Sequence, residues 1–374
     1  NLPAGTPGAV VAFKDYANTF DTGNLTLVQN GSDKIGGSTV NATINTEGIA
    51  ITLVFIDSTR GWLVTDSGLQ SESPTEQYVA ATGGTITTCG DFKIHTFTGP
   101  GTFCVSCAGN ASGNNQLEYI VVAGGGGNGY CGGNAMGGAG AGGFRFASPS
   151  LAPATYPGKP LAAPAGLTAS AGATPVTVGA GGSPGGPSVN QQGTAGSTST
   201  FSTISSAGGA KGSRGAVNSG VGDAGGSGAG GAGGGYNRAA GAGNTPTVSP
   251  PQGQPGGNGG NNPAYPDHAS GGGGGAICAG SQGRSTSNNS SGPGGDGAGI
   301  PTAFGANGES CGSFRYYAGG GAGEYYAPVT PQKATGGKGG GGNGGTCTPG
   351  TANTGGGGGG GGTPGDAGGA GGSG

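Results

Sequence analysis

The sequence GGGGGGGG occupies positions 355–362 and is the longest of several glycine blocks in the second part of the chain. Other blocks lie at 124–127, 271–275 and 339–342. A segment of this composition has almost no side chains with which to build an apolar core. If it folds, backbone must pack against backbone, and this requirement constrains both the architecture and the function.

Three conformations compete for such a glycine-rich region. Disorder is the usual expectation for low-complexity sequence of this kind. Collagen needs Gly at every third position, and the stretch GGSPGGPSVNQQGTAGSTSTF at 181–201 breaks that period. The third conformation is a bundle of polyglycine II helices, which have three residues per turn and no internal hydrogen bonds. Each buried N–H and C=O group then has to bond to a neighbouring segment.

The segments between the glycine blocks favour the third conformation. They carry varied side chains that pure linkers rarely have, as in Phe314-Arg-Tyr-Tyr317 and Glu324-Tyr-Tyr326. Short rigid rods joined by such loops would form a slab with loops at its ends. We expect these loops at 144–178, 236–268, 281–291, 301–317 and 324–334.

The first part of the chain has the alternating and continuous apolar patterns of β-strands. We expect strands at 9–13, 24–29, 50–56, 61–65, 91–98, 102–107 and 117–123. The run Ile51–Ile56 is apolar on both faces, which indicates burial on both. Asp57–Gly61 reads as a hairpin turn with Gly61 at positive φ, and Trp62 as a core anchor. The pattern of the later strand predicts Phe92 and Ile94 inside, with Lys93 and His95 outside.

The predicted fold class is all-β N-terminal modules followed by a glycine-rich polyglycine II helix bundle or sandwich. Essentially no α-helix is expected, because Gly costs about 1 kcal/mol per residue relative to Ala in a helix. Four parts are expected: a β module at 1–69, a linker at 70–83, a small β domain at 84–123, and the polyglycine II domain with exposed loops at 124–374. We also expect that further residues precede Asn1 in the natural protein.

Charge and hydropathy exclude two classes of partner. The net charge is −3 and only 8% of residues are charged, so there is no basic stripe to neutralise the phosphates of a nucleic acid. No run approaches the roughly 18 apolar residues that cross a bilayer. We therefore expect no nucleic-acid partner and no membrane insertion.

The chain has seven cysteines, and an odd number excludes a fully paired intrachain framework. Cys104-Val-Ser-Cys107 has the spacing of a metal or redox site, but it has no second such pair and no strand-to-helix setting. Small buried or loop thiols are the favoured interpretation, with no metal. Disulfides among the cysteines of the glycine-rich region remain open.

Catalytic motifs are almost absent. The pattern GxSxG at 181–185 and the pattern GxGxxG at 138–143 are expected by chance in a region so rich in glycine, and no helix is expected after either. His95 and His268 lie far apart in the sequence. We expect a protein that is not an enzyme, with no catalytic residues and no cofactor.

The aromatic and arginine side chains of the predicted loops are the candidate binding residues. Tyrosine offers rigid amphipathic contact area, and arginine offers bidentate contacts. Some of these aromatic residues could instead pack over the slab faces or cap its edges. The receptor-binding candidates are Tyr156, Tyr236, Arg238, Tyr265, Phe304, Phe314, Arg315, Tyr316, Tyr317, Tyr325 and Tyr326.

Two stretches carry a resemblance to a known family. AVVAFKDYANTFDTGNLTLVQNGSDKIGGSTVNATINTEGIAITLVFIDSTRGWLV at 9–64 resembles a β module of tailed-phage fibre proteins. GGTITTCGDFKIHTFTGPGTFCV at 83–105, LEYIVVAGGGGNG at 117–129 and PVTVGAGG at 175–182 resemble the glycine-rich domain of phage tail-fibre and adhesin proteins. The resemblance implies a sandwich of polyglycine II helices whose distal loops contact a host receptor.

These observations lead to the hypothesis of a non-enzymatic tail-fibre or adhesin protein of a bacteriophage. It would be part of the virion, extracellular after release, and a homotrimer attached through its β modules to other fibre or baseplate proteins. Its further partner would be a bacterial surface receptor, either protein or polysaccharide. The alternatives are a purely structural fibre shaft or capsid fibre without receptor contact, and a secreted glycine-rich surface or ice-binding protein.

Overall fold

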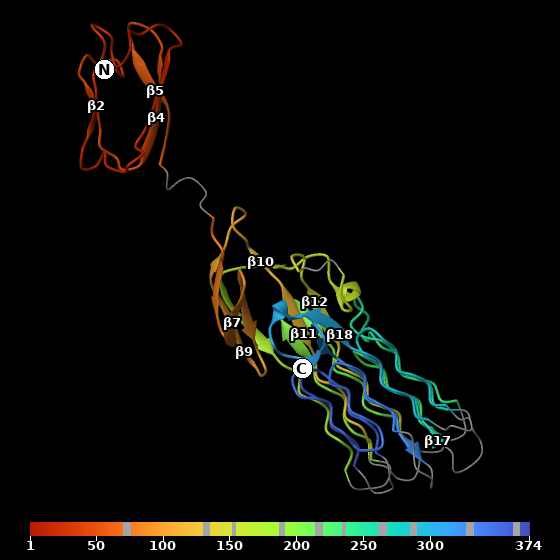
Figure 1. Cartoon of the computed structure of the whole chain (residues 1–374). Helices are drawn as coiled ribbons and strands as arrows, with labels where there is room; N and C mark the ends of the chain where they lie inside the picture. The colour runs from red at the N-terminus through yellow and green to blue at the C-terminus, as the bar shows by residue number, and fades with distance from the viewer. Residues whose placement is uncertain are drawn as a thin grey trace. The chain divides into compact units, whose positions relative to one another are not determined.

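The structure is a computed structural model, and it forms two compact units (Figure 1). Unit 1 comprises Asn1–Tyr78 and Gly109–Asn114, and unit 2 comprises Val79–Ala108 and Asn115–Gly374. The residues that the structure describes are 1–69, 76–129, 135–151, 155–186, 191–213, 220–233, 237–260, 268–284, 290–326, 333–361 and 367–374. Within these ranges there is no α-helix, which confirms the expectation, and no helix long and apolar enough to cross a membrane.

Unit 1 is a small β structure built around Trp62. Its strands are β1 (Val10–Lys14), β2 (Leu25–Leu27), β3 (Ala42–Ile44), β4 (Ile49–Phe55) and β5 (Trp62–Leu69). Antiparallel pairing gives the sheet β1-β4-β5 and the hairpin β2–β3. The Trp62 side chain is fully buried, and its ring meets the ring of Phe55 edge-on at 5.5 Å. The prediction of a core anchor at Trp62 is therefore confirmed.

The turn before Trp62 also follows the prediction, whereas the outer face of β4 does not. Gly61 has φ +71°, and its N–H donates to the Asp57 carbonyl oxygen at 2.7 Å. Leu53 and Phe55 are buried, but Ile56 is 43% exposed. The expectation that both faces of this strand are buried is wrong, because the other elements of unit 1 cover only one face of the sheet.

Asp15 organises the loops at one edge of unit 1. Its buried carboxylate accepts hydrogen bonds from the N–H groups of Thr19, Phe20 and Gly48 at 3.1, 3.0 and 2.9 Å. Burial by itself raises the pKa of the Asp15 carboxyl, but these N–H groups outweigh it and hold the pKa below its ordinary value. The folded unit therefore favours the ionised carboxylate.

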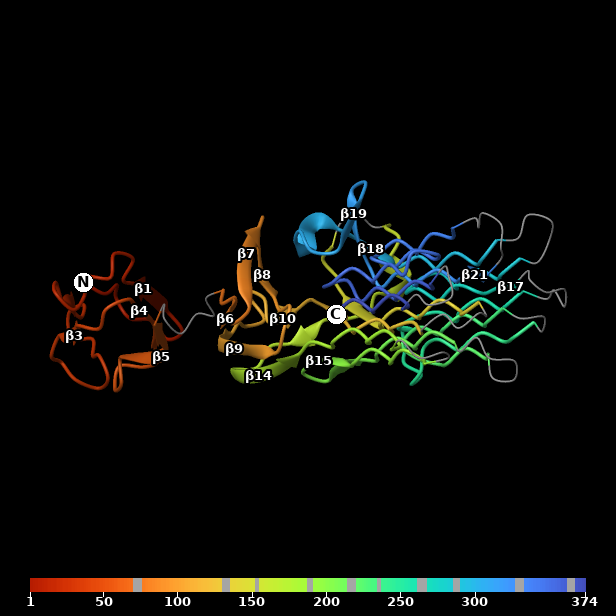
Figure 2. The same cartoon turned by 90° about the horizontal axis from the view of Figure 1, so that it is seen from below.

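Unit 2 begins with a five-stranded antiparallel sheet in the order β16-β15-β14-β9-β6. Its strands are β6 (Val79–Thr82), β9 (Gly101–Ala108), β14 (Gly172–Thr177), β15 (Ser199–Phe201) and β16 (Ile204–Ser206). Figure 2 shows β14 beside β9, and β15 pairs with the other edge of β14. This sheet does not respect two of the expected boundaries. Strand β6 lies within the expected linker 70–83, and β14, β15 and β16 lie beyond residue 123, the expected end of the small β domain. The division into four parts stays a prediction.

A separate hairpin pairs β7 (Thr85–Cys89) with β8 (Phe92–Thr96). Phe92 is 48% exposed, and the His95 ring lies edge-on against the Phe103 ring at 5.1 Å. The expectation of Phe92 inside and His95 outside is wrong. A two-stranded hairpin has no second layer over both faces, so alternation alone does not determine which side chains are buried.

Short strand pairs lie among the glycine-rich segments of unit 2. They are β10 (Gln116–Leu117) with β13 (Leu167–Thr168), β11 (Tyr119–Val122) with β12 (Phe144–Ala147), β17 (His268–Ala269) with β21 (Tyr325–Tyr326), and the sheet β18 (Ala298–Pro301), β20 (Phe314–Tyr317), β19 (Glu309–Cys311). Two short 3-10 helices, η2 (Lys159–Leu161) and η3 (Thr302–Phe304), also occur. Parts of the expected loops 144–178, 301–317 and 324–334, and the last residue of the expected loop 236–268, are thus in strands.

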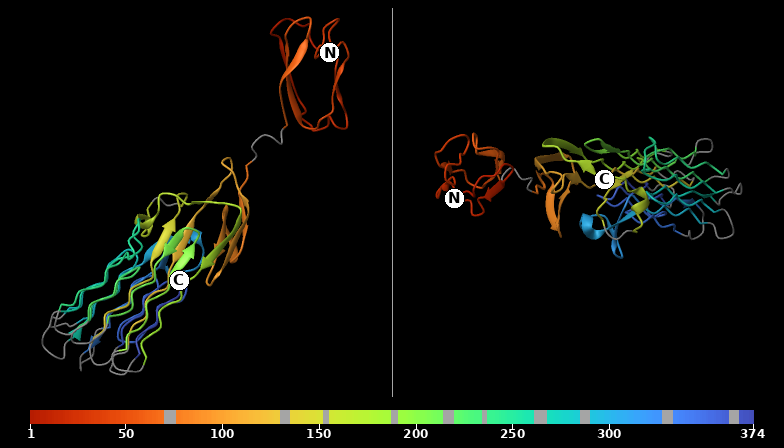
Figure 3. Two further views of the ribbon diagram at one scale, coloured as in Figure 1. Left: turned by 180° about the vertical axis from the view of Figure 1, so that it is seen from behind. Right: turned by 90° about the horizontal axis from the view of Figure 1, so that it is seen from above.

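The remaining glycine-rich segments are extended and belong to no strand, and we call them rods. They lie side by side along most of unit 2 (Figure 3). The rods are 124–129, 135–143, 178–186, 191–197, 207–213, 220–224, 228–233, 237–242, 251–260, 270–275, 279–283, 291–297, 318–324, 333–337, 356–361 and 367–374. The end of the rods near β11, β12, β18 and the C-terminus is the near end, and the end near β17 is the far end (Figure 1).

Main-chain hydrogen bonds join the rods with a repeat of three residues. Successive N–H groups of one rod donate to three different neighbours in rotation. In rod 135–143 the N···O pairs, at 2.8–3.2 Å, are Gly138 to Gly271, Ala139 to Gly358, Gly140 to Ala210, Ala141 to Gly274, Gly142 to Gly355 and Gly143 to Ala207. The same rotation recurs in rods 228–233, 270–275 and 318–324.

Rod 135–143 lies at the centre of this network. It donates to the three neighbours just given, and it accepts hydrogen bonds from three more, in rods 124–129, 228–233 and 318–324. Most of its buried N–H and C=O groups are therefore paired although no strand is formed. Main-chain hydrogen bonds to rods on all sides therefore stabilise this region, as packing of apolar side chains stabilises the core of other domains.

Close approach of the rods explains why glycine is needed within them. A Cβ atom built at Gly273 would lie 2.0 Å from the carbonyl oxygen of Ala139. Alanine occurs where the methyl group has room, and Ala139, Ala141 and Ala322 are fully buried. Glycine and alanine positions in the rods are therefore not interchangeable.

We expect Gly273→Ala to destabilise unit 2 by about 1–3 kcal/mol, the usual cost of overpacking. The new methyl group would force the rod away from Ala139. Thermal or denaturant unfolding followed by circular dichroism measures the change. Gly99→Ala is the matched control, because a Cβ atom at Gly99 would meet nothing within 4 Å. Equal stability of the two variants would contradict the packing described.

We expect Asp15→Asn to lower the melting temperature of unit 1 at neutral pH, because the amide places N–H groups against main-chain donors. A lowered carboxyl pKa stabilises the folded state at pH values above about 3.9, the ordinary pKa of an aspartate. That stabilisation is lost as the pH falls through the folded-state pKa. Melting curves from pH 7 to about pH 2 should therefore converge for the wild type and the variant. A constant difference across that range would exclude the carboxylate as its cause.

Candidate functional site

Several candidate binding residues form an aromatic cluster at the near end of the rods. The Phe146 ring lies 6.0 Å from Phe144, 6.1 Å from Tyr156 and 5.5 Å from Phe304, between ring centroids. Tyr317 joins the cluster with its ring 6.3 Å from Phe144. Together with apolar neighbours such as Ile300 and Leu161, these side chains form the largest buried core of unit 2.

Burial limits what the tyrosines of this cluster offer to a partner. Tyr156 is 7% exposed and Tyr317 is 6% exposed. Burial raises the pKa of Tyr317 to about 12, and its hydroxyl donates to the Asn307 carbonyl oxygen at 2.8 Å. Burial, with the negative charge of Glu118, also raises the pKa of Tyr156. The structure thus gives these residues packing contacts, and their role in receptor binding stays a prediction.

Strand β20 carries the other candidates of the near end. Tyr316 is 8% exposed, and the Lys338 Nζ atom lies 5.6 Å from the centre of its ring. Phe314 and Arg315 are half-buried, and no hydrogen-bond acceptor lies near the buried Arg315 Nε atom in the part of the chain that the structure describes. Phe314, Arg315 and Phe304 therefore keep some surface for a partner.

Two further candidates lie toward the far end of the rods. Tyr325 belongs to β21, which pairs with β17, and its side chain is 5% exposed. The Arg238 carbonyl oxygen accepts a hydrogen bond from Gly259, and the next residue, Gly260, donates to Ala269 of β17. The half-buried Arg238 side chain is thus separated from the aromatic cluster by the length of the rods (Figure 1).

The predicted candidates therefore do not form one site. They divide between the near and far ends, while Tyr236, Tyr265 and the side chain of Tyr326 lie outside the described residues. Arg284 is exposed and lies toward the far end, since the preceding residue, Gly283, donates to Asn258. It was not predicted, because a lone arginine in a Ser/Asn-rich segment gives no pattern. A groove beside Lys211, where rods from three separate stretches of sequence meet, was not predicted either.

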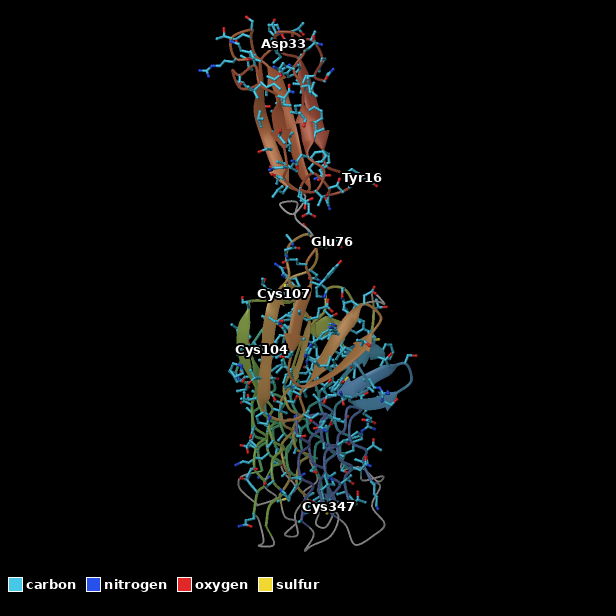
Figure 4. The ribbon with its side chains drawn as sticks, turned by 90° about the vertical axis from the view of Figure 1, so that its left-hand side faces the viewer. Tyr16, Asp33, Glu76, Cys104, Cys107 and Cys347 are labelled. Atoms are coloured by element: carbon cyan, nitrogen blue, oxygen red, sulfur yellow. The ribbon has the colours of Figure 1, made fainter. Side chains whose placement is uncertain are left out.

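The cysteines form no centre among the residues described. Cys89, Cys104, Cys107, Cys278 and Cys311 are free thiols. Cys104 and Cys107 lie on β9, whereas Cys347 lies toward the far end of the rods (Figure 4). Cys131 falls outside the described ranges. Within those ranges, no three His, Cys, Asp or Glu side chains gather in a way that could hold a metal ion.

The two chance motifs lie within rods. Residues 138–143, with the dinucleotide pattern, belong to the central rod and donate to three neighbouring segments. In the pattern at 181–185, the Ser183 N–H donates to the Thr194 hydroxyl at 2.8 Å. Residues 138–143 lead directly into strand β12, so they lack the helix that follows this motif in dinucleotide-binding sites. Residues 181–186 are an extended rod, which differs from the sharp turn that exposes an activated serine.

Comparison with known proteins identifies one family. No curated protein and no solved structure matches the chain. The model of the family described as the glycine-rich domain matches residues 95–374. That range includes all the rods, the aromatic cluster and strands β9 to β21. Because the match spans well over half of the chain, this protein belongs to the glycine-rich domain family.

Proposed function

We propose that the rods are polyglycine II helices and that they form the scaffold of a non-enzymatic bacteriophage tail-fibre or adhesin protein. The observation that carries the proposal is the repeat of three in the hydrogen bonds of the rods. A polyglycine II helix has three residues per turn and no internal hydrogen bonds, so its N–H groups point in three directions in turn. The six bonded neighbours around rod 135–143 support this conformation, because a β-strand bonds to at most two neighbouring strands.

Such a scaffold suits recognition because it is rigid before any partner arrives. Little conformational entropy is then lost when a surface residue at its end makes contact. The far end is the favoured recognition end in this proposal. It lies away from the aromatic cluster and the strands of the near end, and it carries the arginines Arg238 and Arg284. Arginine is well suited to carboxylates and to polar groups of a cell surface.

The remaining parts of the proposal concern assembly. Unit 1 would attach the chain to other fibre or baseplate proteins of the virion and would bring copies together as a homotrimer. The sheet β1-β4-β5 supports this role, since Val10 and Val64 are 61% and 56% exposed and leave apolar area for a neighbour. The receptor would be a bacterial surface molecule, either protein or polysaccharide.

We expect the purified protein, fluorescently labelled, to bind cells of a susceptible bacterium and to compete with phage for adsorption. Removing two charges at the far end with Arg238→Ala and Arg284→Ala should weaken cell binding at least about ten-fold, since charged hydrogen bonds contribute about 1.5–3 kcal/mol each. Cell binding measured by flow cytometry over a concentration series gives the change.

Lys159→Ala with Arg315→Ala is the comparison variant, because it removes two positive charges at the near end, where Arg315 is itself one of the predicted binding residues. Since recognition is proposed at the far end, this variant should bind cells as the wild type does. If the near-end pair weakens binding and the far-end pair does not, recognition belongs to the near end. If no susceptible bacterium binds the protein at all, the fibre shaft without receptor contact is the better description.

A further inference from the structure

We propose that a groove on the surface of unit 2 is a binding site for a neutral oligosaccharide. The groove has a volume of about 410 Å³ and lies between rods 191–197, 207–213 and 220–224. Its volume is comparable to that of small-ligand sites, and the groove is open to solvent along one side. The inference deepens the proposed role in host recognition, and it rests on that role only for the biological source of the sugar.

Rod 191–197 forms one wall of the groove and has an unpaired main-chain donor at the surface. Within this rod, Thr194 and Ser197 donate to rod 178–186, and Gly196 donates to rod 207–213. By the rotation of three, the N–H group of Ala195 points in the third direction, away from both neighbours. Ala195 is exposed and lines the groove, and its N–H group has no acceptor among the described residues.

The wall formed by rod 207–213 follows the same rule. Gly209 and Gly212 donate to rod 124–129, and Ala210 donates to Ser227. The N–H group of Lys211 points in the third direction and has no acceptor in the described part of the chain. Lys211 also lines the groove. Each of the two rods thus has one main-chain N–H group without an acceptor among the described residues, at a residue that lines the groove.

Charged side chains supply the remaining polar groups. The Lys211 Nζ atom lies 3.7 Å from the Asp223 Oδ2 atom, with the two side chains 36% and 47% exposed. An ion pair at this exposure contributes little to stability, so the scaffold does not require it. The pair does place a cationic donor and an anionic acceptor at one groove, with no net charge between them.

The chemistry of the groove fits a sugar better than a peptide. Hydroxyl groups of a sugar both donate and accept, so they match main-chain N–H groups, an ammonium and a carboxylate together. A sugar ring is rigid and loses little entropy on binding, whereas an extended glycine-rich peptide would lose the most. Gly193, Ala195 and Ala224 leave the walls free of bulky side chains. The balanced charge favours a neutral sugar over a strongly acidic one.

The test uses the full chain and an array of neutral oligosaccharides from bacterial surfaces. Isothermal titration calorimetry with the strongest binder gives the affinity. Lys211→Ala with Asp223→Asn should weaken it about ten-fold or more, since two charged hydrogen bonds are lost. Ala195→Phe should also abolish binding, because its ring fills the groove without changing the charge. In NMR spectra the sugar should shift the amide signals of Ala195 and Lys211.

Asp91→Asn with Lys93→Ala is the matched control, with the same charge change on the exposed hairpin β7–β8. It should bind the sugar as the wild type does. No binder on the array, or full affinity in Ala195→Phe, would overturn the proposal. If the protein binds the sugar but no cells, the adhesin role is contradicted, whereas sugar binding in the groove is supported. A protein that binds cells but no sugar contradicts the groove alone.

Discussion

The fold of unit 2 depends on hydrogen bonds between the main chains of neighbouring rods. Ordering glycine costs more conformational entropy than ordering any other residue. Each rod buries almost no apolar side chain that could offset this cost. What remains is the pairing of N–H and C=O groups, and an unpaired buried group would be costly. The rotation of donors around rod 135–143 meets this requirement, because it gives successive N–H groups a partner on different sides.

Because of this constraint, main-chain packing and aromatic side-chain packing occur in different parts of unit 2. Where rods meet, atoms approach so closely that a methyl group fits only at positions such as Ala139 or Ala322. Among the described residues, the aromatic side chains that are buried in unit 2 therefore lie in strands and loops, whereas a few other large side chains, such as Met136 and Glu324, are buried within the rods. The aromatic cluster around Phe146 gathers at the near end, where strands replace rods. Polar and charged side chains line the outer rods, as at Lys211 and Asp223.

Much of this architecture could be predicted from the sequence. Glycine blocks without a strict period excluded collagen and pointed to backbone packing, and the N-terminal strands and Trp62 followed from apolar patterns and a turn signal. The central position of rod 135–143 could not be predicted, because a glycine-rich sequence does not indicate which segments lie next to it in the folded protein. The pairing of β14 with β9 also depends on contacts between distant stretches of sequence.

The candidate site was predicted less well, for a related reason. Tyrosine and phenylalanine in a glycine-rich chain suit both a binding loop and a small core, and sequence alone does not separate the two. Tyr156 and Tyr317 are in fact packed against Phe146 and Phe144. The groove at Lys211 has no local signal, since its lining comes from three rods and depends on main-chain groups that every residue has.

Hydrogen–deuterium exchange of the rod amides tests the central claim most directly. The account predicts strong protection of the amides of Gly138–Gly143 and Gly319–Gly323, each of which is bonded to a neighbouring segment. Ala195 and Lys211, whose N–H groups face outward, should exchange rapidly. Rapid exchange throughout the rods of the folded protein would contradict the account, because it would mean that main-chain bonds do not hold them together.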